Sequence, residues 1–428
     1  MVRQTSVLSQ LESIVGREGV LGDIAAFAVD GLTPQAAVAP ATYEQVAEVM
    51  RYAHAEGQAV IPRGGGVHMH IGNIPARYDI ALSLSRLNAV VEHEPADLTA
   101  TVQAGMTLDD VQKRLGVAGQ ILPLNPSGER ATIGGILAAN AWGPWRHAFG
   151  CARDMTIGLR VVTAEGRITR AGGRVVKNVA GYDLCKLYVG SLGTLGIIVE
   201  ATFKLQPLPR AAATVTAAFK SAAEACALAF ALRGRGLAVR GATLASDGDA
   251  WALAIELAGT PAAVERSRRE IAALARATHG DDTPAAVERS RHEIATLAQV
   301  ADAGSTPPEG LPDGVSLLCK ASVLPARLPA LIDALEALEA PRLLAYPTAG
   351  VCYAAWPSPR DAESIAGAAR ELASAAGGTL VLERCPLDLK RRADVFGGPP
   401  ASLELMRRVK EQFDPQGVLS PGRFVGRL

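Results

Sequence analysis

Three glycine-rich runs between residues 61 and 210 have the composition of ligand-binding loops. This stretch holds 20 of the 43 glycines of the 428-residue chain. The first run, Pro62-Arg63-Gly64-Gly65-Gly66-Val67, follows a short apolar segment. Consecutive glycines permit positive φ and let several amide N–H groups converge in one concavity, an arrangement that binds pyrophosphate oxygens. Taken alone, this loop is equally consistent with a plain hairpin turn.

The other two runs combine glycines with small or apolar neighbours. Residues 125–140 contain Thr132-Ile133-Gly134-Gly135 where a helix is expected to begin, and residues 190–198 space three glycines three apart before an apolar strand. Such residues let a flat ligand approach the backbone closely. Close helix packing is the alternative interpretation of residues 125–140. The three runs together predict a ligand site more specifically than any one of them.

Local patterns predict the elements that position these runs. Thr42 with Gln45 forms a capping box before a helix over residues 42–56, and Gly57 ends it. Thr107 with Asp110 likewise begins a helix that runs through Leu115. Apolar and alternating segments predict strands at 59–61, 98–102, 121–124, 157–163 and 197–205.

Composition excludes several classes of protein. The 43 basic and 43 acidic residues cancel, which argues against a nucleic-acid partner. The six cysteines form no C-x-x-C pair, which argues against a metal finger or a disulfide framework. The start of the chain lacks a signal-peptide core, and no stretch approaches the roughly 20 apolar residues of a membrane span. We expect a cytoplasmic protein with at most a peripheral contact with the inner membrane.

The chain divides into three expected parts. Residues 1–210 carry the glycine runs, residues 211–394 are Ala-rich and form a second domain, and residues 395–428 contain a helix over 403–413 and a turn-rich end. A near-exact repeat, at 260–274 and 283–297, lies within the second domain and predicts a duplicated surface helix over 260–297. Residues 301–314 are expected to form a loop.

These motifs resemble the flavoproteins of the vanillyl-alcohol oxidase and p-cresol methylhydroxylase (PCMH) type. The resemblance covers residues 30–210 and the last 30 residues, where Asp414-Pro415 and Ser420-Pro421-Gly422-Arg423-Phe424 match the closing turn. Residues 141–146 and 172–183 look most like the FAD-binding E subunit of bacterial glycolate oxidase. The implied fold class is α+β: a two-subdomain PCMH-type FAD-binding domain (1–210), an α/β cap (211–394) and a C-terminal segment (395–428) that returns to the FAD domain.

The resemblance also implies which residues bind FAD. Pro62, Arg63, Gly64, Gly65, Gly66 and Val67 would hold the pyrophosphate. The flavin ring and ribityl chain would contact Pro126, Ser127, Gly128, Thr132, Gly134, Gly135 and Ala138. Asp183, Gly193, Thr194, Gly196, Ile197 and Ile198 would complete the site. Members with covalent flavin carry His where this chain has Val67, so we expect FAD to be bound non-covalently.

Catalytic residues are harder to assign, because related subunits use a histidine-rich metal motif in the cap that is not recognisable here. Candidates near the flavin are His147, Lys177, Tyr182 and Arg423, and no metal ligand is expected. A surface histidine is the competing interpretation of His147, and a structural or phosphate-side cation that of Lys177. His68 and His70, which follow the first glycine run, could share one face at a spacing of two, but they are expected to be solvated.

The implied activity is oxidation of a 2-hydroxy acid, glycolate or D-lactate, to the 2-oxo acid with hydride transfer to flavin N5. The implied partners are a homologous flavoprotein subunit and an iron-sulfur subunit of one complex. The alternative is a non-catalytic flavin-binding or electron-transfer subunit whose partner oxidises the substrate. A flavin reductase of cell-wall precursor synthesis fits the C-terminal turn less well.

Overall fold

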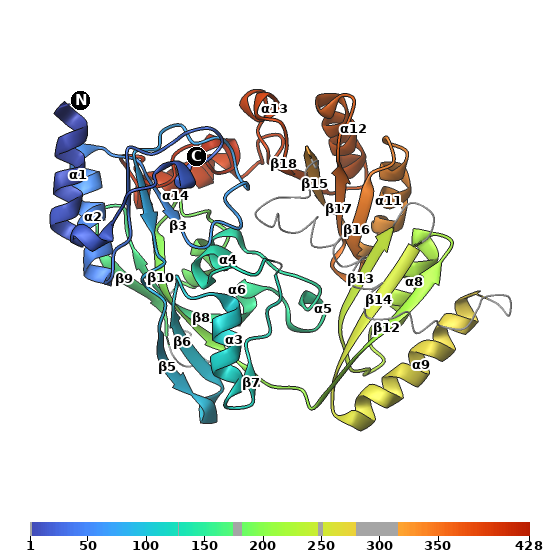
Figure 1. Ribbon diagram of the computed structural model, residues 1–428. Coiled ribbons are helices and arrows are strands. Elements are labelled where there is room, and N and C mark those ends of the chain that lie inside the picture. The colour runs from blue at the N-terminus through green and yellow to red at the C-terminus, as the bar shows by residue number, and fades with distance from the viewer. Residues whose placement is uncertain (1, 127, 174–181, 247–250, 280–315) are drawn as a thin grey trace.

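The computed structural model describes residues 2–126, 128–173, 182–246, 251–279 and 316–428. Two sheet-containing halves lie side by side, and the last residues of the chain return to the first half (Figure 1). Each half has its own large hydrophobic core. The expected α+β class, with a cap beside an N-terminal domain, is confirmed.

The first half begins with a small, mostly parallel sheet that carries the first glycine run. Its four strands lie in the order β1 (Val20–Leu21), β2 (Ala36–Val38), β4 (Ile80–Ser83) and β3 (Val60–Arg63). β2, β4 and β3 are parallel. Helix α1 (Val2–Val15) packs on α2 (Tyr43–Glu56), which begins at Thr42, whose side chain accepts the N–H of Gln45, and ends at left-handed Gly57. The predicted helix 42–56 is therefore confirmed with its caps.

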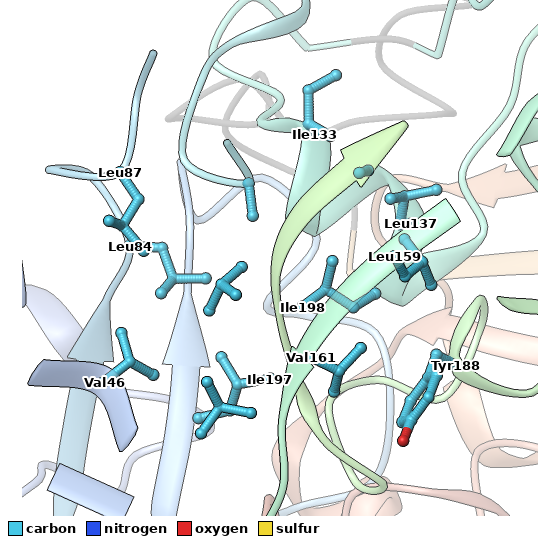
Figure 2. Packing of buried hydrophobic residues seen from close by; sticks show 14 of the residues in the cluster. Val46, Leu84, Leu87, Ile133, Leu137, Leu159, Val161, Tyr188, Ile197 and Ile198 are labelled. Carbon is cyan, nitrogen blue, oxygen red and sulfur yellow. The ribbon is translucent and has the colours of Figure 1, made fainter. Parts of the chain in front are cut away.

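A five-stranded antiparallel sheet completes the first half. Its order is β5 (Val90–Glu94), β6 (Thr99–Gln103), β10 (Ile197–Lys204), β8 (Thr156–Val162) and β9 (Ile168–Gly172). The helices of this part are α3 (Leu108–Gly116), α4 (Ile133–Ala139), α5 (Arg146–Phe149), α6 (Ala152–Met155) and α7 (Cys185–Tyr188). Figure 2 shows side chains of α2, α4, β8 and β10 packed in one core, to which the first sheet adds Ile80 and Leu82. The strand expected at 121–124 is instead β7 (Gln120–Ile121), paired with β11 (Gln206–Pro207).

The second half is a seven-stranded antiparallel sheet. Its order is β12 (Ala211–Phe219), β14 (Trp251–Gly259), β13 (Val239–Ser246), β16 (Arg342–Tyr346), β17 (Val351–Trp356), β15 (Leu317–Ser322) and β18 (Thr379–Arg384). Helices α8 (Ala222–Ala231), α9 (Pro261–His279), α11 (Leu328–Glu336) and α12 (Ala362–Ala375) pack on its outer face (Figure 1). α9 contains the first copy of the repeat, whereas the second copy and the loop expected at 301–314 lie outside the described residues.

The end of the chain joins the first sheet. After α13 (Leu387–Arg392) and α14 (Leu403–Phe413), the chain runs beside β3, where Val60 donates to the Val418 carbonyl at 2.7 Å and accepts from the N–H of Ser420 at 2.9 Å. Asp414 organises this turn, since its carboxylate accepts from the N–H groups of Val418 and Leu419. Val418 and Leu419 are completely buried in the first core.

Candidate functional site: a glycine cradle beside a charged chamber

The three glycine runs meet in one cavity, which we call the cradle. It lies where β3 ends, α4 begins and β10 begins, and it encloses about 810 Å³ of space that is partly open to solvent. Most of the residues expected to bind a cofactor line it: Pro62, Arg63, Gly64, Gly65, Gly66, Val67, Thr132, Gly134, Gly135, Ala138, Gly193, Gly196, Ile197 and Ile198. Segments far apart in sequence therefore present their backbone to one concavity.

Glycine is required at several of these positions because the walls of the cradle approach one another closely. A Cβ on Gly65 would overlap the carbonyl oxygen of Arg130. Gly193 has φ +73°, and a Cβ there would lie 2.8 Å from Cγ of Pro62. Side chains at these points would push the neighbouring segments apart and change the shape of the cradle.

Two arginines border the cradle, and both are held by the protein. The guanidinium of Arg63 lies 4.9 Å from the centre of the Phe27 ring and donates to the Ala26 carbonyl. Arg423 donates to the Met69 carbonyl at 2.7 Å and to the Asp30 carboxylate at 3.2 Å. These contacts hold both guanidinium groups in place, and the Asp30 carboxylate offsets part of the charge of Arg423.

A second cavity, which we call the chamber, lies between the cradle and the inner face of the cap sheet. It encloses about 820 Å³ of partly open space. Its walls are His68, Ile71, Pro126, Ala139, Ala141 and Trp142 from the first half and Lys320, Ser322, Tyr353, Val381, Glu383 and Phe396 from the second. Of the described residues, only His68 and Ala139 line both the cradle and the chamber.

Strand register places the charged groups of the chamber. Lys320 on β15 stands opposite Tyr353 on β17 and Val381 on β18, so these side chains share the inner face. The register shifts next to Glu383, an irregularity that can re-aim a side chain. Lys320 Nζ lies 3.5 Å from the Glu383 carboxylate and 5.2 Å from the centre of the Trp142 ring. A cation thus lies in the chamber with an acidic and two aromatic neighbours.

Burial controls the protonation of these groups. It raises the pKa of Glu383, and the Lys320 ammonium counteracts part of that rise. It also raises the pKa of Tyr353 well above its ordinary value, so this phenol keeps its proton. Tyr353 can therefore donate a hydrogen bond, whereas Lys320 supplies the positive charge.

The expectation that His68 and His70 are solvated is wrong. Burial first, and then the charge of Lys320, lowers the pKa of His68 to about 4. The pKa of His70 is lowered well below its ordinary value by burial and by nearby cations, Arg384 first among them. Both nitrogens of the His70 ring are buried without a hydrogen-bond partner. Both imidazoles are neutral at pH 7, because the loop folds under the cap.

The expected catalytic candidates do not converge. His147 Nδ1 is hydrogen-bonded to Thr348 Oγ1 at 2.8 Å, and His147 lines neither cavity. Tyr182 is 95% exposed, and Lys177 lies outside the described residues. Arg423 borders the cradle but is occupied by the contacts described above. Of the candidates that the structure describes, neither His147 nor Tyr182 therefore lies with Arg423 at the cradle.

Four expected cofactor-binding residues are not among those that line the cradle, and a fifth, Ser127, lies outside the described residues. Pro126 lines the chamber instead. Asp183 is exposed and pairs with Lys186 at 2.8 Å. The Thr194 hydroxyl donates to the Ser191 carbonyl at 2.7 Å. Gly128 has φ +108° in the turn before Thr132 and accepts the N–H of Ala131.

The sequence analysis overlooked the chamber residues on the cap. Lys320 is the one charged residue of its strand, LLCKAS, and Glu383 follows the apolar run Leu380-Val381-Leu382 in TLVLER, next to Arg384. A charged side chain in such a strand is unusual, because buried charges require a partner. That pattern could have identified both residues as candidate site residues, although it could not have shown that their side chains contact each other.

Comparison with known proteins agrees with the cradle geometry. Residues 34–172 match the family described as FAD binding domain, and residues 397–424 match the family described as FAD linked oxidases, C-terminal domain. The chain carries an FAD-binding domain. The first match includes β3 and α4 with their glycine runs, and the second includes the turn at Asp414 that returns to β3.

Curated relatives match part of the chain. Glycolate oxidase subunit GlcD of Bacillus subtilis (strain 168) is 36% identical over 189 residues, 44% of this chain and 40% of that protein. Glycolate oxidase subunit GlcE of Escherichia coli (strain K12) is 44% identical over 124 residues, 28% of this chain and 35% of that protein. D-2-hydroxyglutarate dehydrogenase of Xanthomonas citri pv. viticola is 39% identical over 177 residues, 41% of this chain and 38% of that protein.

These matches span about two fifths of the relatives' own length or less. They do not single out the expected E subunit, because the match to the D subunit covers more of the chain. What they show is similarity to glycolate oxidase subunits and to dehydrogenases of D-2-hydroxy acids.

Solved structures extend the similarity to the whole fold. An alkyldihydroxyacetonephosphate synthase superposes with a TM-score of 0.75 at 18% identity, covering 97% of this chain and 84% of that one. 4-Ethylphenol oxidase from Gulosibacter chungangensis gives 0.73 at 15% identity, covering 99% and 97%. The PCMH-type arrangement of FAD domain and cap is thus shared by proteins with little sequence in common.

The residues of the cradle fit FAD. Glycines whose Cβ positions are blocked line its walls, and two fixed arginines border it, as a long anionic cofactor with a flat ring requires. The residues that the structure describes contain no cluster of three or more His, Cys, Asp or Glu side chains arranged for a metal ion. These residues also form no helix that is long and apolar enough to cross a membrane.

Proposed function

We propose that this chain is an FAD-dependent oxidoreductase that oxidises a small 2-hydroxy acid, glycolate or D-lactate, to the 2-oxo acid. FAD lies non-covalently in the cradle, because Val67, in the glycine loop, has no nucleophilic atom. Residues 1–210 with 395–428 serve as the FAD-binding part, and residues 211–394 serve as the cap that closes over the substrate.

The observation that carries this proposal is that the cradle and the chamber share a wall. His68 and Ala139 line both, so a ligand in the chamber lies next to a ligand in the cradle. Hydride transfer requires the two reacting atoms within near-contact distance. FAD supplies the two-electron acceptor when it is bound.

The chamber has the chemistry to select a small anion. Lys320 gives a cation beside the aromatic rings of Trp142 and Tyr353, and the Tyr353 hydroxyl keeps its proton. Charge-assisted hydrogen bonds from an ammonium group to a carboxylate are among the stronger polar contacts in proteins. The Glu383 carboxylate, 3.5 Å from Lys320 Nζ, orients this ammonium group.

The names of the relatives support the substrate class and suggest partners. Two of them are subunits of glycolate oxidase, and a third is a dehydrogenase of a D-2-hydroxy acid. We place the chain in a complex with a homologous flavoprotein subunit and an iron-sulfur subunit that removes the electrons. The E-subunit resemblance, at 44% identity, also supports the alternative of an accessory flavin-binding subunit whose partner oxidises the substrate.

Purification of the full chain with added FAD tests the proposal. Acid precipitation should release all of the flavin into the supernatant. Glycolate, D-lactate or D-2-hydroxyglutarate added without oxygen should bleach the visible absorbance of the bound flavin. Flavin that remains with the acid-denatured chain would overturn non-covalent binding. Flavin that bleaches only after the partner subunits are added would support the accessory role.

A further inference from the structure

His68 is the ionisable side chain placed between the two cavities. The loop that carries it begins at the end of β3, passes through the glycines of the cradle and continues under the cap. Ala139, the other described residue that lines both cavities, has no group that can exchange a proton. Any acid–base group that acts on a substrate beside the flavin must lie within hydrogen-bond reach of it.

The other ionisable residues of the chamber are poorly suited to accept a proton. Lys320 is a cation, and burial keeps the proton on Tyr353. Glu383 is paired with Lys320 at 3.5 Å and lines only the chamber. Among the described residues that line the chamber, this leaves His68 as the neutral acceptor nearest the cradle.

We infer that His68 takes the proton of the substrate hydroxyl group, an inference that rests on the proposed function. The C–H bond of the hydroxylated carbon breaks and its electron pair leaves with the hydrogen to FAD. The O–H bond breaks and its proton passes to the His68 ring, so that the carbonyl group of the 2-oxo acid forms.

The electrostatics of the chamber make this transfer responsive to the substrate. Burial first, and then the positive charge of Lys320, lowers the pKa of His68. A substrate carboxylate bound to Lys320 neutralises that charge and raises the proton affinity of the imidazole. His68 therefore becomes a stronger base when the acid that it must deprotonate is in place.

His68→Gln removes the acceptor and keeps a polar side chain of similar reach. We expect anaerobic reduction of bound FAD by the acid that works best on the wild type to slow by about 10²- to 10⁴-fold. Retention of FAD, and the dissociation constant of oxalate measured by calorimetry, should stay within about twofold. His54→Gln, on α2 outside both cavities, is the matched control and should match the wild type in all three measurements.

His68→Ala adds a readout that a merely structural role would not give. Added imidazole should restore part of the reduction rate in this variant and should not accelerate His54→Gln. Reduction of His68→Gln at the control rate would overturn the inference, as would a larger loss in Glu383→Gln than in either His68 variant. A wild-type flavin that none of the three acids reduces, with or without partner subunits, would instead refute the proposed function.

Discussion

Asp30→Asn tests the buried ion pairs that connect Lys390 on α13 and Arg423 in the C-terminal turn to Asp30 of the FAD domain. Lys390 Nζ lies 2.7 Å from both Asp30 carboxylate oxygens, and Arg423 lies 3.2 Å from one of them. The side chains of Lys390 and Arg423 are 4% exposed, and that of Asp30 is 11% exposed. The substitution leaves two buried cations without an anion.

Breaking a buried ion pair from one side costs about 3–5 kcal/mol. Lys390 keeps a hydrogen bond to the His70 carbonyl, and Arg423 keeps its bond to the Met69 carbonyl. We therefore expect the lower end, about 3 kcal/mol, which corresponds to a melting temperature lower by about 6–12 °C for domains of this size. Asp30 has φ +50°, a conformation that Asn also adopts, so backbone strain does not contribute.

Asp388→Asn is the matched control. It makes the same chemical change on α13, where Asp388 pairs with Arg391 at 2.8 Å but the two side chains are 76% and 64% exposed. Exposed pairs contribute about 0–1 kcal/mol. Thermal unfolding followed by near-UV circular dichroism compares the two variants. Equal melting temperatures for Asp30→Asn and Asp388→Asn would refute the claim that the buried ion pairs of Asp30 stabilise the fold.

Three further predictions concern the cradle, the chamber and pH. Gly65→Ala should weaken FAD binding about 10- to 100-fold in a fluorescence titration, because its Cβ overlaps a backbone carbonyl, whereas Gly116→Ala, with open space around its Cβ, should not. Lys320→Met should raise the dissociation constant of oxalate about 10- to 100-fold in calorimetry and leave FAD binding unchanged. Folding lowers the pKa values of His68 and His70, so the unfolded chain binds more protons than the folded chain in acid. The free energy of unfolding should therefore fall as the pH drops from 6.5 toward 4, by up to about 1.4 kcal/mol per pH unit for each histidine. Urea denaturation of His70→Gln should show a shallower pH dependence; an identical profile would contradict this origin.

Local signals in the sequence predict the elements around the cradle. The caps of α2 and α3 are formed by Thr42 and Thr107, each within three residues of the N–H that it accepts. The glycine runs are equally local, since each one shapes its own loop. Such features depend on neighbours in sequence, which is why helix 42–56 and the helix after Thr107 could be placed within one residue of their observed bounds.

The chamber depends on contacts that the sequence does not display. Lys320 meets His68 and Trp142 only after the cap sheet folds against the FAD domain. Asp30 and Arg423 form an ion pair although they are 393 residues apart. The expectation of a solvated His68 failed for the same reason, because local sequence does not reveal which loop the cap will cover.

A single-turnover experiment on the chain without its partners tests the central claim most directly. The full chain loaded with FAD is mixed anaerobically with excess glycolate, D-lactate or D-2-hydroxyglutarate, and flavin absorbance and 2-oxo acid are measured together. The account predicts bleaching by at least one acid, with one 2-oxo acid formed for each FAD reduced. Flavin that stays oxidised with all three acids, although a chemical reductant bleaches it, would contradict the claim that this chain oxidises a 2-hydroxy acid itself.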